Sequence, residues 1–211
     1  MIKKNNNKTK RQPNKKTNVS QLGATILLLF FFSGLSYSCR ENYTPRPYGY
    51  YRVAIPEHDY LVFDSVGLPY KFDISKAATV KPNNRNNEKH WIDVVYPTLN
   101  GKIHGSYKAV HNNLFELSED TWKFVSAHTS RADDMSRIEF GSSEKSVYGI
   151  LYTIKGNVAS PVQFVLTDSV KHFFRGALYF DNKPNKDSIA PMLNYIHEDI
   201  VRLMETFEWK E

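Results

Sequence analysis

The run at residues 147–180, VYGILYTIKGNVASPVQFVLTDSVKHFFRGALYF, decides the fold class of this chain. Within it, residues 147–154, 161–167 and 171–180 are rich in β-branched and aromatic side chains, which favour strands. Short polar turns separate the three stretches, KGN after the first and DS after the second. Turns this short join neighbouring antiparallel strands. The run therefore predicts a three-stranded antiparallel meander.

Further strands are expected ahead of this meander. Residues 50–55 and 70–74 alternate apolar and polar side chains well enough to predict two strands. Residues 91–96 and 102–107 are strand-like on either side of a turn that contains Asn-Gly, which is a strong hairpin signal between two such runs. The sheet is therefore expected to contain at least one hairpin besides the meander.

Two helices are predicted, one between the two groups of strands and one at the end of the chain. The first covers 114–132, because Asn113 followed by Glu116 resembles a capping box. Its inward stripe is Leu114, Leu117, Thr121, Val125 and His128. The second begins with Ser188 as its cap and carries apolar residues at helical spacing, namely Ile189, Met192, Ile196, Ile200, Leu203 and Phe207. The predicted class is α+β, a single domain with one antiparallel sheet and helices packed on it.

The N-terminus has the layout of a bacterial lipoprotein signal. Basic residues precede a short apolar run at 26–32, and the single cysteine, Cys39, stands where cleavage of such a signal occurs. We expect residues 1–38 to be a signal peptide and Cys39 to carry the lipid. The alternative is an uncleaved membrane anchor, but the apolar stretch falls short of the ~20 residues that a spanning helix usually needs.

Removal of this leader changes the charge of the chain. It contains 28 Lys and Arg against 22 Asp and Glu, but seven of the basic residues and none of the acidic ones precede Cys39. The remaining 21 basic and 22 acidic residues nearly balance, so nothing argues for nucleic acid as a partner. We expect residues 39–49, punctuated by two prolines, to form a tether and residues 50–211 to form the single domain.

No catalytic or metal-binding motif stands out. The seven histidines include no pair at a three- or four-residue spacing, which gives no metal ligand pair, and no cofactor is expected. The acidic pairs Glu119/Asp120 and Asp133/Asp134 are interpreted as solvated helix ends, and the serines near Gly141 as part of a loop. The small-residue segment 156–160 is interpreted as a turn, with close approach of a ligand as the alternative.

Motifs spread along the chain resemble the gliding motility lipoprotein GldD family. They are the tether YTPRPYGY at 43–50, SYK at 106–108 with NNL at 112–114, HT at 128–129 with AD at 132–133, VYGILY at 147–152 with KGNVAS at 155–160, FFRGALYF at 173–180, PNKDS at 184–188 and ETFEWK at 205–210. The resemblance covers essentially the whole chain after Cys39. The order of strands and helices also looks like the Mog1/PsbP-type α/β sandwich.

The resemblance implies a Bacteroidetes cell-envelope lipoprotein required for gliding and associated with type IX protein secretion, with no known catalytic residues. We expect a non-catalytic accessory or assembly component, held in the membrane by its acyl anchor and bound to envelope proteins. The candidate partner contacts are Tyr43, Arg46, Tyr48 and Arg131, since aromatic and arginine side chains carry most binding energy. The alternative is a periplasmic ligand-binding or hydrolytic domain that acts on envelope material.

The residues after Cys39 bear on the side of the membrane that the domain faces. Arg40, Glu41 and Asn42 do not form an acidic cluster of the kind that directs surface display in these bacteria. We therefore expect the domain to sit at the outer membrane and to face the periplasm.

Overall fold

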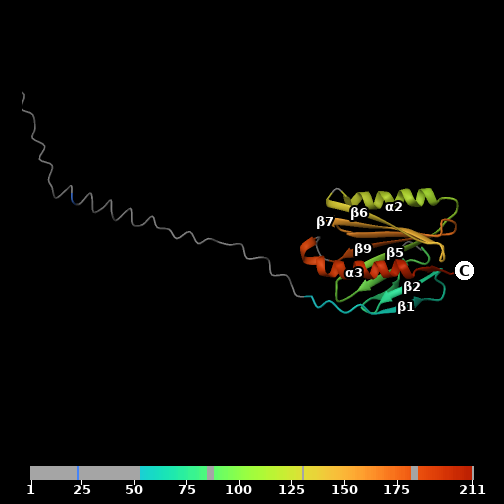
Figure 1. Ribbon diagram of the computed structural model, residues 1–211, viewed down its shortest axis with the longest axis horizontal. Coiled ribbons are helices and arrows are strands. Elements are labelled where there is room, and N and C mark those ends of the chain that lie inside the picture. Colours follow the sequence, from blue (N-terminus) through green and yellow to red (C-terminus); the bar gives the residue numbers. More distant parts are fainter. Residues whose placement is uncertain (1–22, 24–52, 85–87, 130, 182–184, 211) are drawn as a thin grey trace, which may run out of the picture. The chain divides into compact units, whose positions relative to one another are not determined.

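The structure is a computed structural model that describes Gly23 and residues 53–84, 88–129, 131–181 and 185–210 (Figure 1). The chain divides into two units, Met1–Tyr48 and Gly49–Glu211. All described residues except Gly23 belong to the second unit.

Ten strands and two helices make up the described part of this unit. In chain order they are β1 (Tyr60–Asp64), β2 (Tyr70–Ser75), β3 (Thr79–Pro82), β4 (Ile92–Tyr96), β5 (Gly101–Ala109), α2 (Leu114–Thr129), β6 (Ala132–Ser142), β7 (Val147–Gly156), β8 (Val162–Thr167), β9 (His172–Phe180), α3 (Lys186–Thr206) and β10 (Glu208–Trp209). They form a seven-stranded sheet in the order β3-β4-β5-β9-β8-β7-β6 and a three-stranded sheet in the order β1-β2-β10. All neighbours are antiparallel, which confirms the α+β class.

The predicted meander is present as β7, β8 and β9. Ile150 lies opposite Val165, and Val165 lies opposite Arg175. The predicted hairpin is present as well, because β4 and β5 pair on either side of a turn in which Asn100 adopts a φ of 50°. Asparagine tolerates this left-handed conformation better than most residues, which explains why the Asn-Gly signal was reliable.

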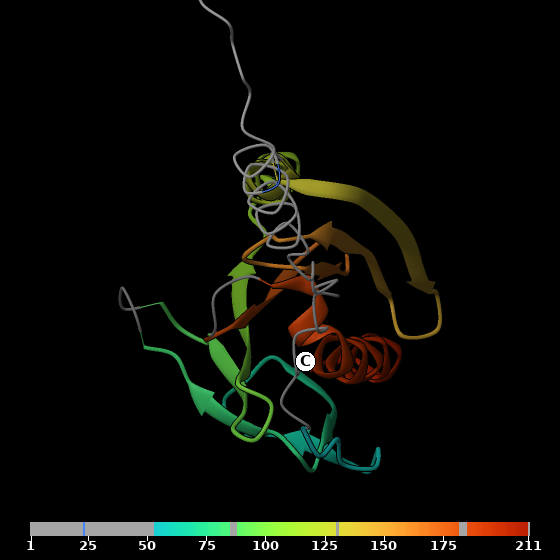
Figure 2. The same ribbon diagram turned by 90° about the vertical axis from the view of Figure 1, so that its left-hand side faces the viewer.

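Two layers cover the large sheet, one on each face (Figures 1 and 2). Helix α3 and the small sheet lie on one face, which we call the inner face, and α2 lies on the other, the outer face. The central core of the inner face includes Phe72 from β2, Ile103 from β5, Phe174 from β9 and Ile196 from α3. A smaller cluster joins Val125 of α2 to β7. The predicted stripe of α3 is buried from Ile189 to Leu203, and Phe207 lies just past the end of the helix. In the predicted stripe of α2 only Thr121 and Val125 are buried, while the other members are partly exposed.

Two facing glycines leave room for aromatic rings on the inner face. Gly105 of β5 is opposite Gly176 of β9. A Cβ atom on Gly105 would meet Phe174 Cζ at 2.7 Å, and one on Gly176 would overlap the ring of Phe164. Both contacts would be shorter than van der Waals contact. The rings therefore occupy the space that a side chain at either glycine would fill.

The N-terminal strand and the number of sheets differ from the prediction. Residues 50–52 lie outside the described residues, and residues 53–55 form no strand. The first described strand is instead β1, which pairs with β2. The expected single sheet is two sheets, because β2 pairs with β1 and β10 and has no partner in the seven-stranded sheet. Periodicity identifies strands but does not show which strands pair.

The region between the predicted first helix and the meander also differs. Helix α2 ends at Thr129, and β6 occupies residues that were interpreted as a helix end and a loop. Most side chains of β6 are exposed, so the strand lacks the apolar alternation that marks a buried face. Its hydrogen bonds come from β7, which pairs with it along nearly its whole length.

The final helix begins three residues before the predicted cap, Ser188, would allow. Helix α3 begins at Lys186, and its cap is Asn185, whose side chain accepts a hydrogen bond from the Ser188 backbone N–H at 3.3 Å. Asparagine and serine are both favoured at this position. The choice between them depends on backbone angles that the residue types do not specify.

Candidate functional site

Part of the outer face of the large sheet is left open beside α2. In the sheet, His104 lies opposite Asp93 and Ala177, while Ser106 lies opposite Arg175. Alternate residues of a strand point to the same face, so these side chains share the outer face. They form the floor of what we call the outer-face groove.

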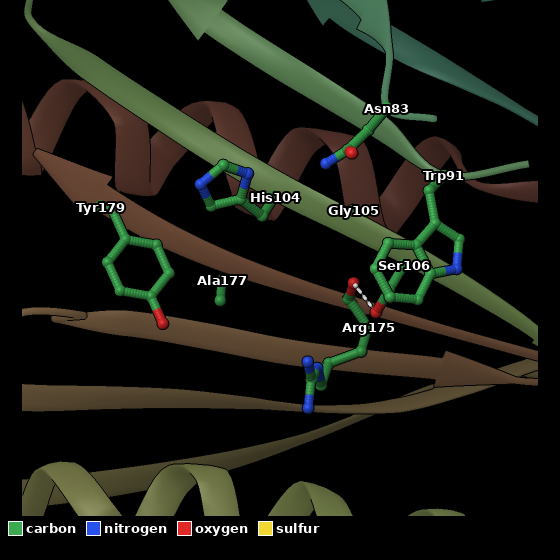
Figure 3. A pocket seen from close by; sticks show the side chains of 8 residues that line it. All are labelled: Asn83, Trp91, His104, Gly105, Ser106, Arg175, Ala177 and Tyr179. Atoms are coloured by element: carbon green, nitrogen blue, oxygen red, sulfur yellow. Dashed lines mark hydrogen bonds between the residues drawn. The ribbon is translucent and has the colours of Figure 1, made fainter. Parts of the chain in front are cut away.

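Two adjacent cavities make up this groove. The first, of about 260 Å³, is lined by Asn83, Trp91, His104, Gly105, Ser106, Arg175, Ala177 and Tyr179 (Figure 3). The second, of about 180 Å³, is lined by Trp91, Ser106, Lys108, Leu117, Asp120, Thr121, Phe124, Phe173 and Arg175. The cavities share Trp91, Ser106 and Arg175, which places these three side chains at the junction.

Arg175 is the central charge of the groove. Its guanidinium extends toward α2 and lies 4.0 Å from the centroid of the Phe124 ring. The half-buried position lowers the pKa of Arg175, while the charges of Tyr179 and Asp120 oppose this effect. Asp120 itself forms an ion pair with Lys123, at 2.9 Å. Among the residues that the structure describes, no carboxylate lies within ion-pair distance of Arg175.

A polar network occupies the other side of the first cavity. Asp93 Oδ1 lies 2.7 Å from His104 Nδ1 and accepts a hydrogen bond from Asn83 Nδ2 at 2.8 Å. The Ser106 hydroxyl donates to the backbone carbonyl of Arg175 at 3.3 Å. A serine nucleophile has to hydrogen-bond to its base, and here the hydroxyl proton is directed to a carbonyl group instead of His104.

Aromatic rings form the walls of the groove. Trp91 and Tyr179 stand on opposite sides of Ala177 (Figure 3). The Trp91 indole N–H donates to the Tyr107 carbonyl at 3.0 Å, which fixes the ring, and Lys108 Nζ lies 5.6 Å from its centroid. Phe124, on α2, is 51% exposed although it is large and apolar. Exposed rings beside an arginine are typical of surfaces that bind other proteins.

A second polar cluster joins the segment before β1 to α3. His58 lies between two carboxylates, with Nδ1 2.9 Å from Asp199 Oδ1 and Nε2 2.9 Å from Glu198 Oε2. The Tyr60 hydroxyl donates to Asp199 Oδ1 at 3.0 Å, and burial together with this bond raises the pKa of Tyr60. The His58 ring stacks on Tyr195 at 4.2 Å. These bonds fasten the start of the domain to α3, and we interpret the cluster as structural.

Comparison with known protein families identifies the chain. The model of the family described as gliding motility lipoprotein GldD matches residues 40–209. The chain belongs to the GldD family. Membership in this family implies a role in gliding motility and a lipid anchor in the cell envelope.

Two further comparisons complete the picture of this GldD family member. No curated protein matches it. The solution structure of cyanobacterial PsbP (CyanoP) from Synechocystis sp. PCC 6803 is similar to it with a TM-score of 0.44 at 9% identity, over 74% of this chain and 95% of that chain.

Most candidate residues that the sequence suggested for this GldD protein cannot be placed. Cys39, Tyr43, Arg46 and Tyr48 lie outside the described residues. Arg131 is exposed in the turn between α2 and β6, because the helix ends three residues earlier than predicted. It lines neither cavity of the groove.

The small-residue segment 156–160 packs within the protein. Val158 and Ser160 are buried, and Gly156 adopts a φ of 122°, in which other residues are strained. This segment is therefore a packed turn, as its preferred interpretation predicted.

Two kinds of feature are absent from the described residues. No group of three or more His, Cys, Asp or Glu side chains is arranged to hold a metal ion in that part of the chain. No helix among the same residues has the length and apolar character needed to cross a bilayer.

Proposed function

We propose that this GldD family member is a non-catalytic accessory component of gliding motility and of type IX protein secretion, and that it acts by binding an envelope protein through the outer-face groove. One observation carries the proposal: a half-buried arginine without an ion-pair partner among the described residues lies against an exposed phenylalanine. Arginine and aromatic side chains dominate the energy of protein interfaces.

The proposal includes the anchor and its location. Cys39 is the acylation site, the lipid is in the outer membrane, and the domain faces the periplasm. Anchoring confines both partners to one surface, which raises the effective concentration of the domain near its partner. Tyr43, Arg46 and Tyr48 of the tether, together with Arg131, are proposed as additional contacts with the partner.

Two phenylalanines of α2 provide a matched test. Phe124 lines the groove and is 51% exposed, whereas Phe115 is 77% exposed and lines neither cavity. We expect Phe124→Ala to reduce colony spreading, type IX secretion and the yield of crosslinked partner, while Phe115→Ala leaves all three unchanged. Equal protein levels on a blot make the comparison valid. If the two variants spread, secrete and crosslink to the same extent, the partner does not bind through this groove.

One observation supports the hydrolytic alternative. Asp93 orients His104 at the edge of a cavity, as a carboxylate does for a catalytic base. The two functions differ in the effect of His104→Asn. If this variant is stable and abolishes motility while Phe124→Ala does not, catalysis replaces binding as the function of the groove.

A further inference from the structure

We propose that the outer-face groove binds an acidic side chain on an extended segment of the partner protein, and that Arg175 is the group that pairs with its carboxylate. This inference rests on the proposed function and deepens it, because it specifies the chemistry of the partner segment.

The charge of Arg175 is unmatched among the residues that the structure describes. Removing a cation from water is costly unless an anion compensates it. The ring of Phe124 lies over the guanidinium at 4.0 Å and takes up one of its faces. Stacking of this kind leaves the N–H edge available, and that edge matches the two oxygens of a carboxylate.

The acids near the groove already have cationic or polar partners. Asp93 is bound to His104, Glu88 accepts from Lys108, and Asp120 pairs with Lys123. Lys102 lies opposite Tyr179 on the same face, and within the described part of the chain no acid lies within ion-pair distance of it. The charge that is left over is positive, so a complementary occupant is acidic.

The shape of the site fits an extended segment. The two cavities meet at Arg175 and have Trp91 at their junction, with Tyr179 in one and Phe124 in the other. An extended segment that places its acid at Arg175 also places neighbouring side chains on these rings. A free small anion would leave the rings uncovered, which favours a peptide segment.

The test is a binding experiment on the full-length protein in detergent. The probe is an array of short peptides with a central Glu and varied aromatic or aliphatic flanks, together with an identical array that carries Gln. We expect the best Glu peptides to bind at least about tenfold more tightly than their Gln counterparts, because hydrogen bonds to charged groups are stronger than neutral ones. If no Glu peptide binds better than its Gln counterpart, the proposal is wrong.

Variants then assign the preference to one side chain. Arg175→Gln is expected to abolish the discrimination between Glu and Gln, and Arg175→Lys to retain part of it because the charge stays and the two-pronged geometry is lost. Arg137→Gln is the control, since Arg137, on β6, is exposed and lines neither cavity. The Tm of each variant is measured first, and binding is compared only among variants that keep the Tm of the parent protein. Full discrimination by Arg175→Gln, or by Arg175→Lys if the former does not fold, would overturn the assignment.

Two outcomes separate this inference from its alternatives. If glutarate alone binds as tightly as the best peptides, the ligand is a small carboxylate and the peptide assignment is overturned. If Glu peptides bind through Arg175 but Phe124→Ala and Arg175→Gln cells glide and secrete normally, the ligand chemistry holds while the proposed function of the groove fails.

Discussion

Phe207, between α3 and β10, provides the most direct test of how the two sheets are joined. The side chain is fully buried. Its ring lies 5.6 Å from Tyr70, 5.4 Å from Phe174 and 4.8 Å from Trp209, measured between centroids. It therefore contacts β2 of the small sheet and β9 of the large sheet at once.

Replacing Phe207 by Ala removes the transfer energy of the ring and leaves a cavity. Such changes cost about 3–5 kcal/mol. In a domain of this size each kcal/mol shifts Tm by about 2–4 °C, so Tm is expected to fall by roughly 6 to 20 °C. Urea unfolding followed by circular dichroism measures the same loss as a lower midpoint at an unchanged slope.

The control for this prediction is Phe115→Ala, which removes the same ring from an exposed position. We expect that variant to stay within about 0.5 kcal/mol of the parent protein. A loss of less than about 1 kcal/mol for Phe207→Ala would refute the reasoning, because the small sheet and its closing strand would then not be part of the cooperative core.

Further predictions concern the final helix, the pH dependence and the anchor. Ile196→Ala and Ile200→Ala each remove a fully buried side chain, and each is expected to lower the unfolding free energy by about 2–5 kcal/mol in urea titrations. Burial lowers the pKa of His172 and of His197, so the unfolded chain binds protons at a higher pH than the folded chain. Stability is therefore expected to decrease as the pH falls below ~6.5, and His197→Gln should reduce the slope of the urea midpoint against pH. Cys39→Ala should abolish incorporation of labelled fatty acid, and labelling of that variant would show that the lipid is attached elsewhere.

The sequence predicted the parts of the fold that are local. The meander and the β4–β5 hairpin were recognisable because their turns are short and their strands carry buried side chains. Strand β6 was missed because it lies at the edge of the large sheet, where Ser136 and Arg137 are exposed and apolar alternation is absent. The division into two sheets arises because β2 pairs only with β1 and β10, and no pattern in the sequence shows this choice of partners. Strand β10 itself is too short for a pattern to indicate.

The groove was harder to predict than the fold. His104, Ser106 and Arg175 belong to strands that were largely predicted, and alternation alone places His104 and Ser106 on one face. Nothing in the sequence shows that β9 lies beside β5, although that pairing brings Arg175 next to Ser106. The position of Phe124 over Arg175 depends in addition on how α2 lies on the sheet, which is a tertiary property.

The small sheet is completed by a strand that lies far from its other two strands in sequence. Glu208 of β10 pairs with Lys71 of β2, and the same side chains form an ion pair at 2.8 Å. At ~5–20 residues per second, synthesis of the chain between Ser75 and Glu208 takes roughly 7 to 27 s. During that time β1 and β2 have no third strand, and a two-stranded hairpin is only marginally stable in water. The small sheet therefore closes only after every strand of the large sheet has been synthesised, and β1 and β2 remain an unfinished hairpin until then.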